Sequence, residues 1–378
     1  MRYIVCGGGT GGHVYPALAV CEALREIDGS AQILYLGTSS GFEAKLVPAA
    51  GVEFVCISSG GVAGKSLARA LRGAAAAYVG LAQSLGIVGK FQPHVALGTG
   101  GYVSGPALLA CWLRGVPVSV QEQNVYPGLT NKLLARISTR VFVAFPESVF
   151  YFPPRVVPKM RVTGNPIRKA ILNAERGQGH RLFGTDSSLL TVVVFGGSRG
   201  AKPLVMAALQ VASKLRHRQV QFIVVTGERL FDEATQFVEA SGIAWSKGGN
   251  VILRPYVEQM DLAYSVADIV VSRAGALTVS ELAATGIPSL LVPSPYVANR
   301  HQEHNAKVLA ERGAAMVLTE GPDLARELGE KLDWLLSHPR EREQMGQKAR
   351  QVAKPRAART IAEELFRLAE RRACACIS

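Results

Sequence analysis

The sequence is poor in cysteine: six cysteines occur in 378 residues, without the spacing of a disulfide framework. This scarcity argues against a small disulfide-stabilised secreted domain and favours a reduced cytosolic compartment. No signal peptide is expected either, because the chain opens directly into a strand pattern at Arg2–Cys6. Near the other end, Cys374 and Cys376 form a Cys-Ala-Cys pair, which we interpret as part of a disordered tail rather than as a metal site.

Acidic residues are also in short supply, with 29 Asp and Glu against 42 Lys and Arg, and the formal net charge is +13. An excess of positive charge indicates an anionic partner, such as a nucleic acid, a phosphorylated substrate or an anionic membrane surface. We expect no nucleic-acid partner, because neither interleaved aromatic and basic residues nor a helix-turn-helix pattern accompanies the charge.

No Asp or Glu occurs between Glu53 and Glu122, although this stretch contains the basic residues Lys65, Arg69, Arg72, Lys90 and Arg114. Its middle, residues 73–89, is uncharged and rich in Ala, Leu, Ile and Val. Gln83, Ser84 and several glycines argue against a transmembrane span. The pattern therefore indicates a surface that lies on an anionic membrane. The alternative is a buried Ala-rich helix with a solvated basic rim.

The glycine loop Gly7–Gly12 follows the first expected strand and matches the GxGxxG pattern of dinucleotide-binding loops. The acidic residue that binds an adenosine ribose in such folds is missing, because the next strand, Ile33–Leu36, ends in Gly37-Thr38. A nicotinamide or flavin cofactor is therefore not expected, but the loop backbone can still hold a diphosphate. His13 lies at the rim of this loop, where it acts either as a base or as a structural hydrogen-bonding group.

The stretch Asp268–Glu281 predicts a buried strand, a turn at Ala274-Gly275 and a helix that begins at Ala276. The first N–H groups of such a helix bind phosphate without a lysine. Glu281 lies about one turn further on, where its carboxylate can reach the hydroxyls of a ribose. An ordinary strand–turn–helix of an α/β sheet is the alternative.

Buried strand patterns alternate with helical patterns along the chain, which predicts an α/β fold with parallel sheets covered by helices on both faces. The expected strands are Arg2–Cys6, Ile33–Leu36, Glu53–Ile57, His94–Gly98, Val116–Val120, Arg140–Ala144, Leu189–Phe195, Gln221–Thr226, Val251–Leu253, Asp268–Ser272, Ser289–Val292 and Ala315–Leu318. Glycine-rich or polar loops follow several of them. Because ligands of open α/β sheets bind beyond the carboxyl ends of the strands, these loops mark candidate sites.

The length of the chain predicts two domains. We expect an N-terminal, membrane-facing domain over 1–163 and a C-terminal domain over 164–340. The proline-rich segment Phe150–Lys159 is interpreted as a linker. A helical tail over 341–378, broken near Pro355, is expected to pack back on the first domain. Two glycine loops, Gly7–Gly12 in the first domain and Gly196–Gly200 after the strand Leu189–Phe195 in the second, imply two Rossmann-like halves that face each other across a cleft.

Several motifs together resemble those of the MurG family, in order and spacing, over roughly residues 1–313. They are Gly7–His13 with Pro16, Gly100–Pro106, Glu122–Asn124, Gly164–Arg168, Gly196–Ser198 and Gly275–Glu281. The resemblance implies a GT-B fold and an inverting transfer of GlcNAc from UDP-GlcNAc to the 4-hydroxyl of MurNAc in undecaprenyl-pyrophosphoryl-MurNAc-pentapeptide (lipid I), which forms lipid II for peptidoglycan. It also implies a peripheral enzyme on the cytoplasmic face of the plasma membrane, in contact with anionic lipid and with other cell-wall synthesis proteins.

The resemblance also implies roles for individual residues. His13 and Glu122 are the candidate catalytic residues, with His13 favoured as the base and Glu122 either a base or an orienting group. The donor residues are Thr10, Gly11, Gly12, Asn124, Arg168, Ser198, Val257, Ala276, Leu277, Thr278, Glu281 and Gln302. Thr10–Gly12 also face the acceptor diphosphate, together with Gly9, Gly98, Gly100, Gly101 and Tyr102. Two positions depart from the family pattern: Gln121, where the family often has His, and Arg199, where Gln is common.

Paired carboxylates of the Asp-x-Asp type, which hold a metal in many transferases, do not occur in the sequence. We therefore expect no metal site and no cofactor, with a helix N-terminus and arginine stabilising the leaving diphosphate instead. Three alternatives remain open at this point. They are another lipid glycosyltransferase such as a diacylglycerol glucosyltransferase, a UDP-GlcNAc 2-epimerase, and a non-catalytic nucleotide-binding protein.

Overall fold

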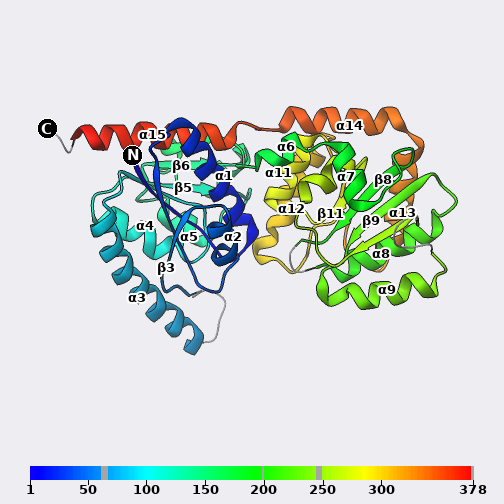
Figure 1. Ribbon diagram of the computed structural model, residues 1–378, viewed down its shortest axis with the longest axis horizontal. Helices are drawn as coiled ribbons and strands as arrows, with labels where there is room; N and C mark the ends of the chain where they lie inside the picture. Colours follow the sequence, from blue (N-terminus) through cyan, green and yellow to red (C-terminus); the bar gives the residue numbers. More distant parts are fainter. Residues whose placement is uncertain (61–66, 198–199, 244–248, 376–378) are drawn as a thin grey trace. The chain divides into compact units, whose positions relative to one another are not determined.

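The computed structural model describes residues 1–60, 67–197, 200–243 and 249–375, with the backbone alone at 67–70. The chain forms two compact units, which Figure 1 shows in the colours of the sequence. The first unit comprises Met1–Arg168 and Lys354–Ser378, and the second comprises Lys169–Ala353. Both ends of the chain therefore belong to the first unit.

In its described residues, the first unit contains a seven-stranded sheet in which all neighbours run parallel, in the order β3-β2-β1-β4-β5-β6-β7. The strands are β1 (Arg2–Cys6), β2 (Gln32–Gly37), β3 (Glu53–Cys56), β4 (Val95–Gly98), β5 (Val118–Glu122), β6 (Arg140–Val143) and β7 (Met160–Val162). The helices are α1 (Gly11–Ile27), α2 (Glu43–Ala49), α3 (Leu67–Phe91), α4 (Ser104–Leu113), α5 (Leu129–Leu134) and α15 (Ala357–Ala375), with 3-10 turns η1 (Pro146–Tyr151) and η2 (Val157–Lys159).

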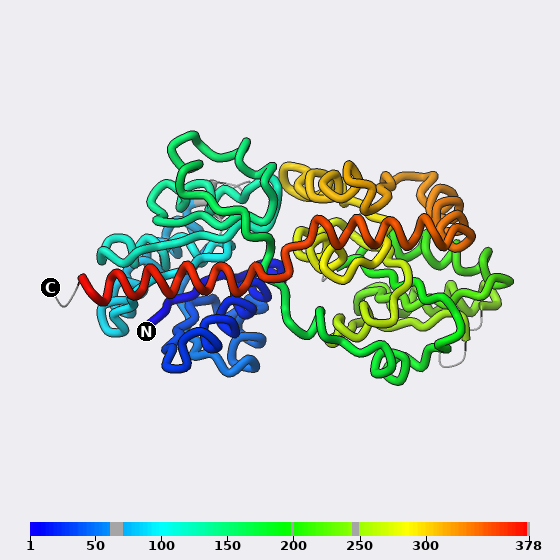
Figure 2. Tube along the Cα trace, turned by 90° about the horizontal axis from the view of Figure 1, so that it is seen from above, coloured from blue at the N-terminus to red at the C-terminus, as the bar shows by residue number. Residues whose placement is uncertain are grey.

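Alternate side chains of the first sheet enter two different apolar layers, because successive residues of a strand point to opposite faces. Ile4 and Cys6 of β1 pack with residues of α3 and α4. Tyr3 and Val5 pack on the other face with α1 and α15. Figure 2 shows α15 lying along the first unit, where its residues Ile361 and Leu365 are buried. Cys374 lies inside this helix and not in a disordered tail, whereas Cys376 is outside the described residues.

The described part of the second unit contains a six-stranded parallel sheet in the order β10-β9-β8-β11-β12-β13. The strands are β8 (Leu190–Phe195), β9 (Val220–Val225), β10 (Val251–Arg254), β11 (Ile269–Ser272), β12 (Ser289–Leu291) and β13 (Met316–Val317). The helices are α6 (Lys169–Asn173), α7 (Arg176–Phe183), α8 (Lys202–Lys214), α9 (Phe231–Ala240), α10 (Met260–Val266), α11 (Ala276–Thr285), α12 (His301–Ala310), α13 (Leu324–Ser337) and α14 (Pro339–Val352), with 3-10 turns η3 (Glu228–Leu230) and η4 (Ala298–Arg300).

Both sheets have the same strand topology: the chain starts in the middle, moves outward on one side and then returns to build the other side. The reversal occurs between β1 and β4 in the first unit and between β8 and β11 in the second. Ligands of open α/β sheets bind at such reversal points, beyond the carboxyl ends of the strands. The prediction of two Rossmann-like parallel-sheet domains is confirmed. In each domain, the strand order identifies the edge of the sheet at which a ligand is expected to bind.

Two local predictions are wrong. The segment Phe150–Lys159 is not an interdomain linker, because it forms 3-10 turns that lead into β7, and β7 pairs with β6 inside the first sheet. The first helix begins at Gly11 rather than near Val14, because the N–H groups of His13 and Val14 already donate to the Thr10 carbonyl, at 3.1 and 3.2 Å. Pro16 therefore lies within the helix and not in its first turn.

The unit boundaries also lie later in the chain than the expected 163/164 and 340/341. Helix α14 packs on α11, and Arg350 donates from Nη2 to the Thr285 carbonyl at 3.1 Å. Residues 341–353 therefore belong to the second unit, and the chain returns to the first unit at Lys354.

The packing of α14 depends on a glycine. A Cβ atom at Gly346 would lie 2.4 Å from the Gly286 carbonyl oxygen, a backbone atom that cannot rotate away. Alanine normally stabilises a helix interior by about 1 kcal/mol relative to glycine, but overpacking of this kind typically destabilises by about 1–3 kcal/mol. We expect Gly346→Ala to lower the melting temperature, measured by differential scanning calorimetry.

Gly329 in α13 is the matched control, because its nearest neighbour, Cγ2 of Val211, is at an ordinary 3.6 Å. Gly329→Ala should leave the melting temperature unchanged or raise it. If both alanine variants behave alike, the close approach of α14 to Gly286 is not what limits stability.

Candidate functional site

The glycine loop of the first unit follows β1 and leads into the N-terminus of α1. Gly9 has a φ of +85°, and its N–H donates to Oε2 of Glu43 at 2.9 Å. The Gly8 N–H donates to the Gly100 carbonyl at 3.2 Å, which ties this loop to the loop after β4. Gly11 and Gly12 form the first turn of α1, so N–H groups at the positive end of its dipole lie at the carboxyl edge of the sheet.

The loop after β4 passes so close to the first loop that only glycine fits. Gly101 has a φ of +79°, and a Cβ atom there would lie 2.4 Å from the Gly8 carbonyl oxygen. Gly100 has a φ of +109°, and its Cβ would lie 2.8 Å from the His13 ring. The structure thus brings Gly9, Gly98, Gly100, Gly101 and His13 together at one edge of the first sheet, with Tyr102 about half exposed beside them.

His13 is held by its Nδ1 atom, which lies 3.0 Å from the Thr99 carbonyl and 3.1 Å from Oε1 of Gln123. Both neighbours are acceptors, so Nδ1 carries the proton in the neutral ring. Nε2 is then the unprotonated nitrogen and can accept a proton. The imidazole therefore has the tautomer that a general base needs.

Glu122 is buried, and both of its carboxylate oxygens accept hydrogen bonds. Oε1 accepts from the backbone N–H and from Nδ2 of Asn124, at 2.9 and 3.2 Å. Oε2 accepts from the Gly128 N–H at 3.0 Å and from Nδ2 of Asn131 at 2.9 Å. The carboxylate is thus shaped to hold the backbone of the loop after β5, including Asn124.

Two residues that support the glycine loop were not identified from the sequence. Glu43 is fully buried at the start of α2 and accepts from the Gly9 N–H and from the Thr38 N–H and hydroxyl, at 2.9, 3.1 and 2.7 Å. Tyr35 of β2 donates its hydroxyl to the Gly7 carbonyl at 2.9 Å, and burial raises its pKa well above the usual value, so it remains a donor. In the sequence, Glu43 is distinguished only by its position a few residues after Gly37-Thr38. Gly37-Thr38 is where an acidic residue that binds ribose would be expected and is missing.

In the second unit, the turn Arg273–Gly275 joins β11 to α11 as predicted. Gly275 is the N-cap residue and has no side chain, so the first-turn N–H groups of Leu277 and Thr278 receive no side-chain cap. Ala274 is fully buried, and its carbonyl accepts from Nδ2 of Asn305 at 3.2 Å. The helix N-terminus therefore faces the carboxyl edge of the second sheet in a geometry that suits phosphate oxygens.

A buried ion pair fixes this turn, and it too was missed in the sequence. The Arg273 guanidinium pairs with Glu320 and donates to the Val292 carbonyl at 3.0 Å. Arg273 follows β11, Val292 follows β12 and Glu320 follows β13, so one guanidinium ties the carboxyl ends of three strands together. Because its charge is already paired, we assign Arg273 to holding the turn.

Glu281 is 7% exposed and accepts from the Tyr264 hydroxyl at 2.9 Å. The Tyr264 ring lies edge-on to Phe195 at the end of β8, with the ring centroids 5.9 Å apart. Gln302, in the first turn of α12, accepts the Ser294 N–H with Oε1 at 2.8 Å, which directs its amide. Val257 is buried in the loop after β10.

The second unit thus collects Val257, Ala276–Thr278 and Gln302 on loops and helix ends beyond the carboxyl ends of its strands. Arg168 belongs to the first unit, where its guanidinium stacks 4.5 Å from the centroid of the Tyr15 ring. Asn124 also lies in the first unit. Ser198 and Arg199 are outside the described residues.

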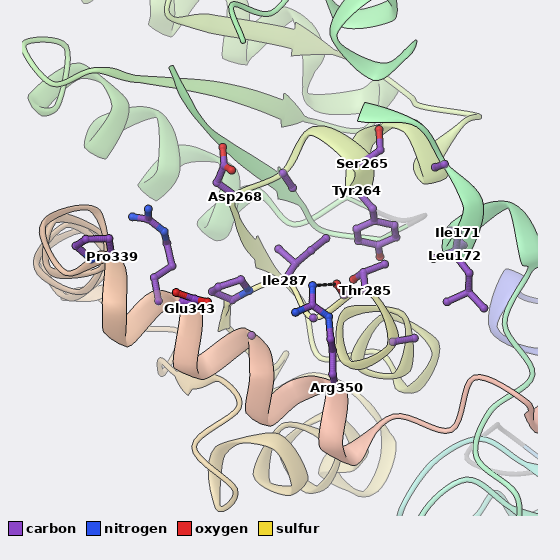
Figure 3. Close-up of a pocket in the computed structure, with 17 residues that line it drawn as sticks. Ile171, Leu172, Tyr264, Ser265, Asp268, Thr285, Ile287, Pro339, Glu343 and Arg350 are labelled. Atoms are coloured by element: carbon purple, nitrogen blue, oxygen red, sulfur yellow. Dashed lines mark hydrogen bonds between the residues drawn. The ribbon is translucent and has the colours of Figure 1, made fainter. Parts of the chain in front are cut away.

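A separate cavity of about 720 Å³ lies at the opposite edge of the second unit (Figure 3). Its lining includes Asp268 and Ile287, which precede β11 and β12, together with Arg350 of α14. Its charged groups have protein partners: Arg350 donates to the Thr285 carbonyl, and Asp268 accepts from Arg176 at 3.0 Å. This cavity does not contain the predicted site residues.

The chain matches two family models, the glycosyltransferase family 28 N-terminal domain over residues 3–143 and its C-terminal domain over 191–362. Two similar curated relatives are each described as UDP-N-acetylglucosamine–N-acetylmuramyl-(pentapeptide) pyrophosphoryl-undecaprenol N-acetylglucosamine transferase. The one from Caldanaerobacter subterraneus subsp. tengcongensis is 40% identical over 94% of this chain and 96% of its own length. The one from Symbiobacterium thermophilum is 41% identical over 98% and 96%.

Among solved structures, MurG of Acinetobacter baumannii is similar with a TM-score of 0.76 and 29% identity, over 97% of this chain and 99% of that one. UDP-GlcNAc 2-epimerase from Neisseria meningitidis bound to UDP-GlcNAc has a TM-score of 0.70 at 15% identity, over 97% and 100%. The second likeness concerns the fold alone. Architecture therefore does not separate transferase from epimerase, and the separation depends on sequence identity and on the site residues.

Proposed function

Since this chain belongs to the MurG family within glycosyltransferase family 28, we propose that its first unit binds a lipid-linked acceptor and its second unit a nucleotide-sugar donor. The protein is an N-acetylglucosaminyltransferase of the GT-B fold. It transfers GlcNAc from UDP-GlcNAc to lipid I and forms lipid II in peptidoglycan synthesis. The assignment of each substrate to a unit, and of each residue to a step, is our proposal.

The observation that carries the proposed mechanism is the pair of acceptors, the Thr99 carbonyl and Oε1 of Gln123, that face Nδ1 of His13. Its Nδ1 proton is donated to acceptors, so Nε2 presents a lone pair beside a glycine loop suited to a diphosphate. In our proposal Nε2 removes the proton from the 4-hydroxyl of MurNAc. The hydroxyl oxygen then forms a bond to the anomeric carbon of GlcNAc while the bond from that carbon to the diphosphate breaks. A single displacement of this kind inverts the anomeric centre.

The acceptor diphosphate is assigned to the first unit. Of the predicted residues, Gly9 and Gly100 already donate their N–H groups to Glu43 and Ser104, at 2.9 and 3.2 Å, and they shape the loop together with Gly98. The ligands of the diphosphate would be the N-terminus of α1 at Thr10–Gly12, the Gly101 N–H and Tyr102. Glu122 orients the loop that carries Asn124, because its carboxylate is already occupied by four hydrogen bonds. We therefore place Glu122 as a positioning residue and His13 as the base.

The donor is assigned to the second unit. The N–H groups of Ala276–Thr278, with Ser198, would bind its diphosphate and stabilise the leaving UDP. Glu281 would accept the ribose hydroxyls, the Val257 backbone would contact uracil, and Gln302 would bind GlcNAc. Asn124 and Arg168, which the family resemblance predicts to contact the donor, belong to the first unit.

Transfer is expected to proceed without a protein-bound divalent ion, because the sequence contains no Asp-x-Asp and a helix N-terminus supplies positive charge to the leaving group. Turnover should persist in EDTA after the protein has been dialysed against the chelator. Loss of turnover that is restored by a metal at a defined stoichiometry would contradict this prediction.

The acceptor carries an undecaprenyl chain and is therefore embedded in a membrane. Helix α3 has an apolar surface that can contact this membrane. Residues Leu71–Phe91 of α3 are long and apolar enough, by length and composition, to cross a membrane, and most of these residues are not buried in the unit. One face of the helix packs on the unit: Gly80 lies against the Ser58 carbonyl, and Val88 is buried in the core. The other face exposes Leu71 and Tyr78, which are 63% and 76% exposed.

We propose that α3 lies flat on the cytoplasmic leaflet, so that the enzyme is peripheral. Exposed apolar side chains continue on the neighbouring α4 and α5, at Trp112, Leu113, Leu129 and Leu133. Arg72, Lys90 and Arg114 are exposed on the same helices or at their ends. Of the basic residues predicted to bind lipid, Lys65 and the Arg69 side chain lie outside the described residues.

Changing Lys65, Arg69, Arg72 and Lys90 to Gln should release the protein from vesicles that contain anionic lipid. Each basic residue at such a surface contributes about 1 kcal/mol, and salt screens the attraction. The measurement is sedimentation with vesicles at low and high salt. The matched control changes four basic residues of the second unit, Lys214, Arg216, Arg229 and Lys331, to Gln and so removes the same charge. Equal binding by the two variants would remove the proposal.

The proposed function as a whole is tested by incubating the protein with labelled UDP-GlcNAc and a short-chain lipid I analogue. We expect label in a lipid product that requires the MurNAc acceptor. Label transferred to diacylglycerol, or epimerisation of the sugar without an acceptor, would instead support the rival activities.

A further inference from the structure

Three buried amide side chains lie behind His13 and form one connected chain of hydrogen bonds. They are Gln121, Gln123 and Asn165, which are 0, 2 and 3% exposed. Gln121 and Gln123 lie at the end of β5, and Asn165 lies in the segment that leaves the first sheet after β7. An amide can present either oxygen or nitrogen to a neighbour, so each of these groups needs a partner that fixes its orientation.

The orientation of the Asn165 amide is fixed by a backbone carbonyl, which can only accept a hydrogen bond. The Gln123 carbonyl accepts from Nδ2 of Asn165 at 3.1 Å, which leaves Oδ1 of Asn165 to accept from Nε2 of Gln121 at 2.9 Å. Oε1 of Gln121 then accepts from Nε2 of Gln123, which also donates to the Thr99 and Gln121 carbonyls, at 2.6 and 3.3 Å. The remaining atom, Oε1 of Gln123, faces Nδ1 of His13 at 3.1 Å.

From this connectivity we propose that Gln121 and Asn165 are positioning residues that fix the tautomer of His13 through the amide of Gln123. If the Gln123 amide turned over, its nitrogen would donate to Nδ1, and the Thr99 carbonyl alone would then favour the proton on Nδ1. Part of the ring population would move its proton to Nε2. Nε2 could then no longer accept a proton from a substrate hydroxyl. The inference depends on the proposed function for the role of His13 as base, but the tautomer itself can be measured without a substrate.

The first test is the tautomer of His13 in the whole protein labelled with ¹⁵N-histidine. Signals of His13 are identified by their loss in His13→Gln, and nitrogen shifts and couplings distinguish a protonated Nδ1 from a protonated Nε2. We expect a single tautomer with the proton on Nδ1 in the wild type. Gln121→Leu should give a mixture of the two tautomers, because Nε2 of Gln123 loses its side-chain acceptor and keeps only the Thr99 and Gln121 carbonyls.

Ser119→Ala is the matched control. Ser119 lies on the same strand two residues earlier, is fully buried, and its Oγ makes no hydrogen bond in the described residues. This substitution should leave the His13 signals unchanged. An unchanged tautomer in Gln121→Leu as well would overturn the proposal.

The second test is the pH profile of kcat. Gln121→Leu should lower kcat in proportion to the fraction of His13 that loses the Nδ1 proton, by about twofold for an equal mixture of tautomers, with the donor KM unchanged. Gln121→Glu keeps an acceptor for Gln123 and so should keep the tautomer, although the Asn165 amide must turn over because a carboxylate cannot donate to its Oδ1. The negative charge of this variant should raise the pKa of the acidic limb. Because Glu has nearly the volume of Gln, this variant tests the proposal even if the Leu variant does not fold.

If the acidic limb of the kcat profile lies at the same pH in Gln121→Glu and in the wild type, the proposal is contradicted. A glutamine with only a structural role would not change the pKa of the base. His13→Ala, measured in parallel, separates the two levels of inference. If His13→Ala keeps its kcat, the assignment of the base fails, while the tautomer spectra still decide whether Gln121 and Asn165 orient the ring.

Discussion

Replacement of His13 by alanine is expected to lower kcat by at least about 100-fold, because loss of a general base typically slows a reaction by a factor of about 10²–10⁴. The donor KM should stay near the wild-type value, since the donor is assigned to the other unit. The acidic limb of the kcat profile should disappear with the imidazole. Steady-state kinetics with UDP-GlcNAc and a lipid I analogue over a range of pH measure all three effects.

Glu122→Gln provides the comparison, because it keeps the shape of the side chain and removes the charge. In the wild type the Glu122 carboxylate accepts from the N–H groups of Asn124 and Gly128. The variant should therefore lose part of its stability and some activity, but it should keep the acidic limb of the kcat profile. A kcat that survives in His13→Ala but collapses in Glu122→Gln, with the limb lost there, would transfer the role of base to Glu122.

Glu281→Ala is expected to raise the donor KM by about 10- to 150-fold. The proposed contact is a charge-assisted pair of hydrogen bonds to the ribose hydroxyls, worth about 1.5–3 kcal/mol in total, and each 1.4 kcal/mol corresponds to a factor of ten. The kcat at saturating donor should change much less, because the ribose is remote from the bond that breaks. Titration of UDP by isothermal calorimetry should show a matching loss of affinity.

Tyr264→Phe is the control for this variant. It removes the hydrogen bond to Glu281 and keeps the aromatic ring that packs on Phe195. If the carboxylate acts on the donor, Tyr264→Phe should raise KM only slightly. Equal effects of the two substitutions would mean that Glu281 acts through its contact with Tyr264 and not through the ribose.

The features predictable from the sequence were those that depend on local pattern. Continuous apolar runs such as Val192–Phe195 and Ile269–Val271 are typical of strands buried on both faces, and they lie in strands of the structure. The turn at Gly275 and the helix that follows were readable because glycine and the 3.6-residue period occur together. β7 was missed because three prolines precede it and only three residues pair.

The parts of the candidate site that were not predictable depend on contacts between distant residues. Glu43 reaches Gly9 across 34 positions of sequence, and Arg273 reaches Glu320 across 47. No periodic pattern relates such pairs, because they are brought together by the order of strands in the sheet. The role of Gln121 is of the same kind, since its partner Asn165 is 44 residues away.

The return of α15 to the first unit has a consequence for synthesis. Its residues Ile361, Leu365 and Leu368 complete the apolar layer that contains Tyr3 and Val5. A ribosome adds about 5–20 residues per second, so about 10–40 s pass between the emergence of Arg168 and that of Lys354. During that time the first unit exposes this face to solvent, and the nascent chain is open to aggregation or to chaperone binding. The last helix to be synthesised therefore completes the core of the unit that is synthesised first. Truncation by a stop codon before residue 361 should yield insoluble protein.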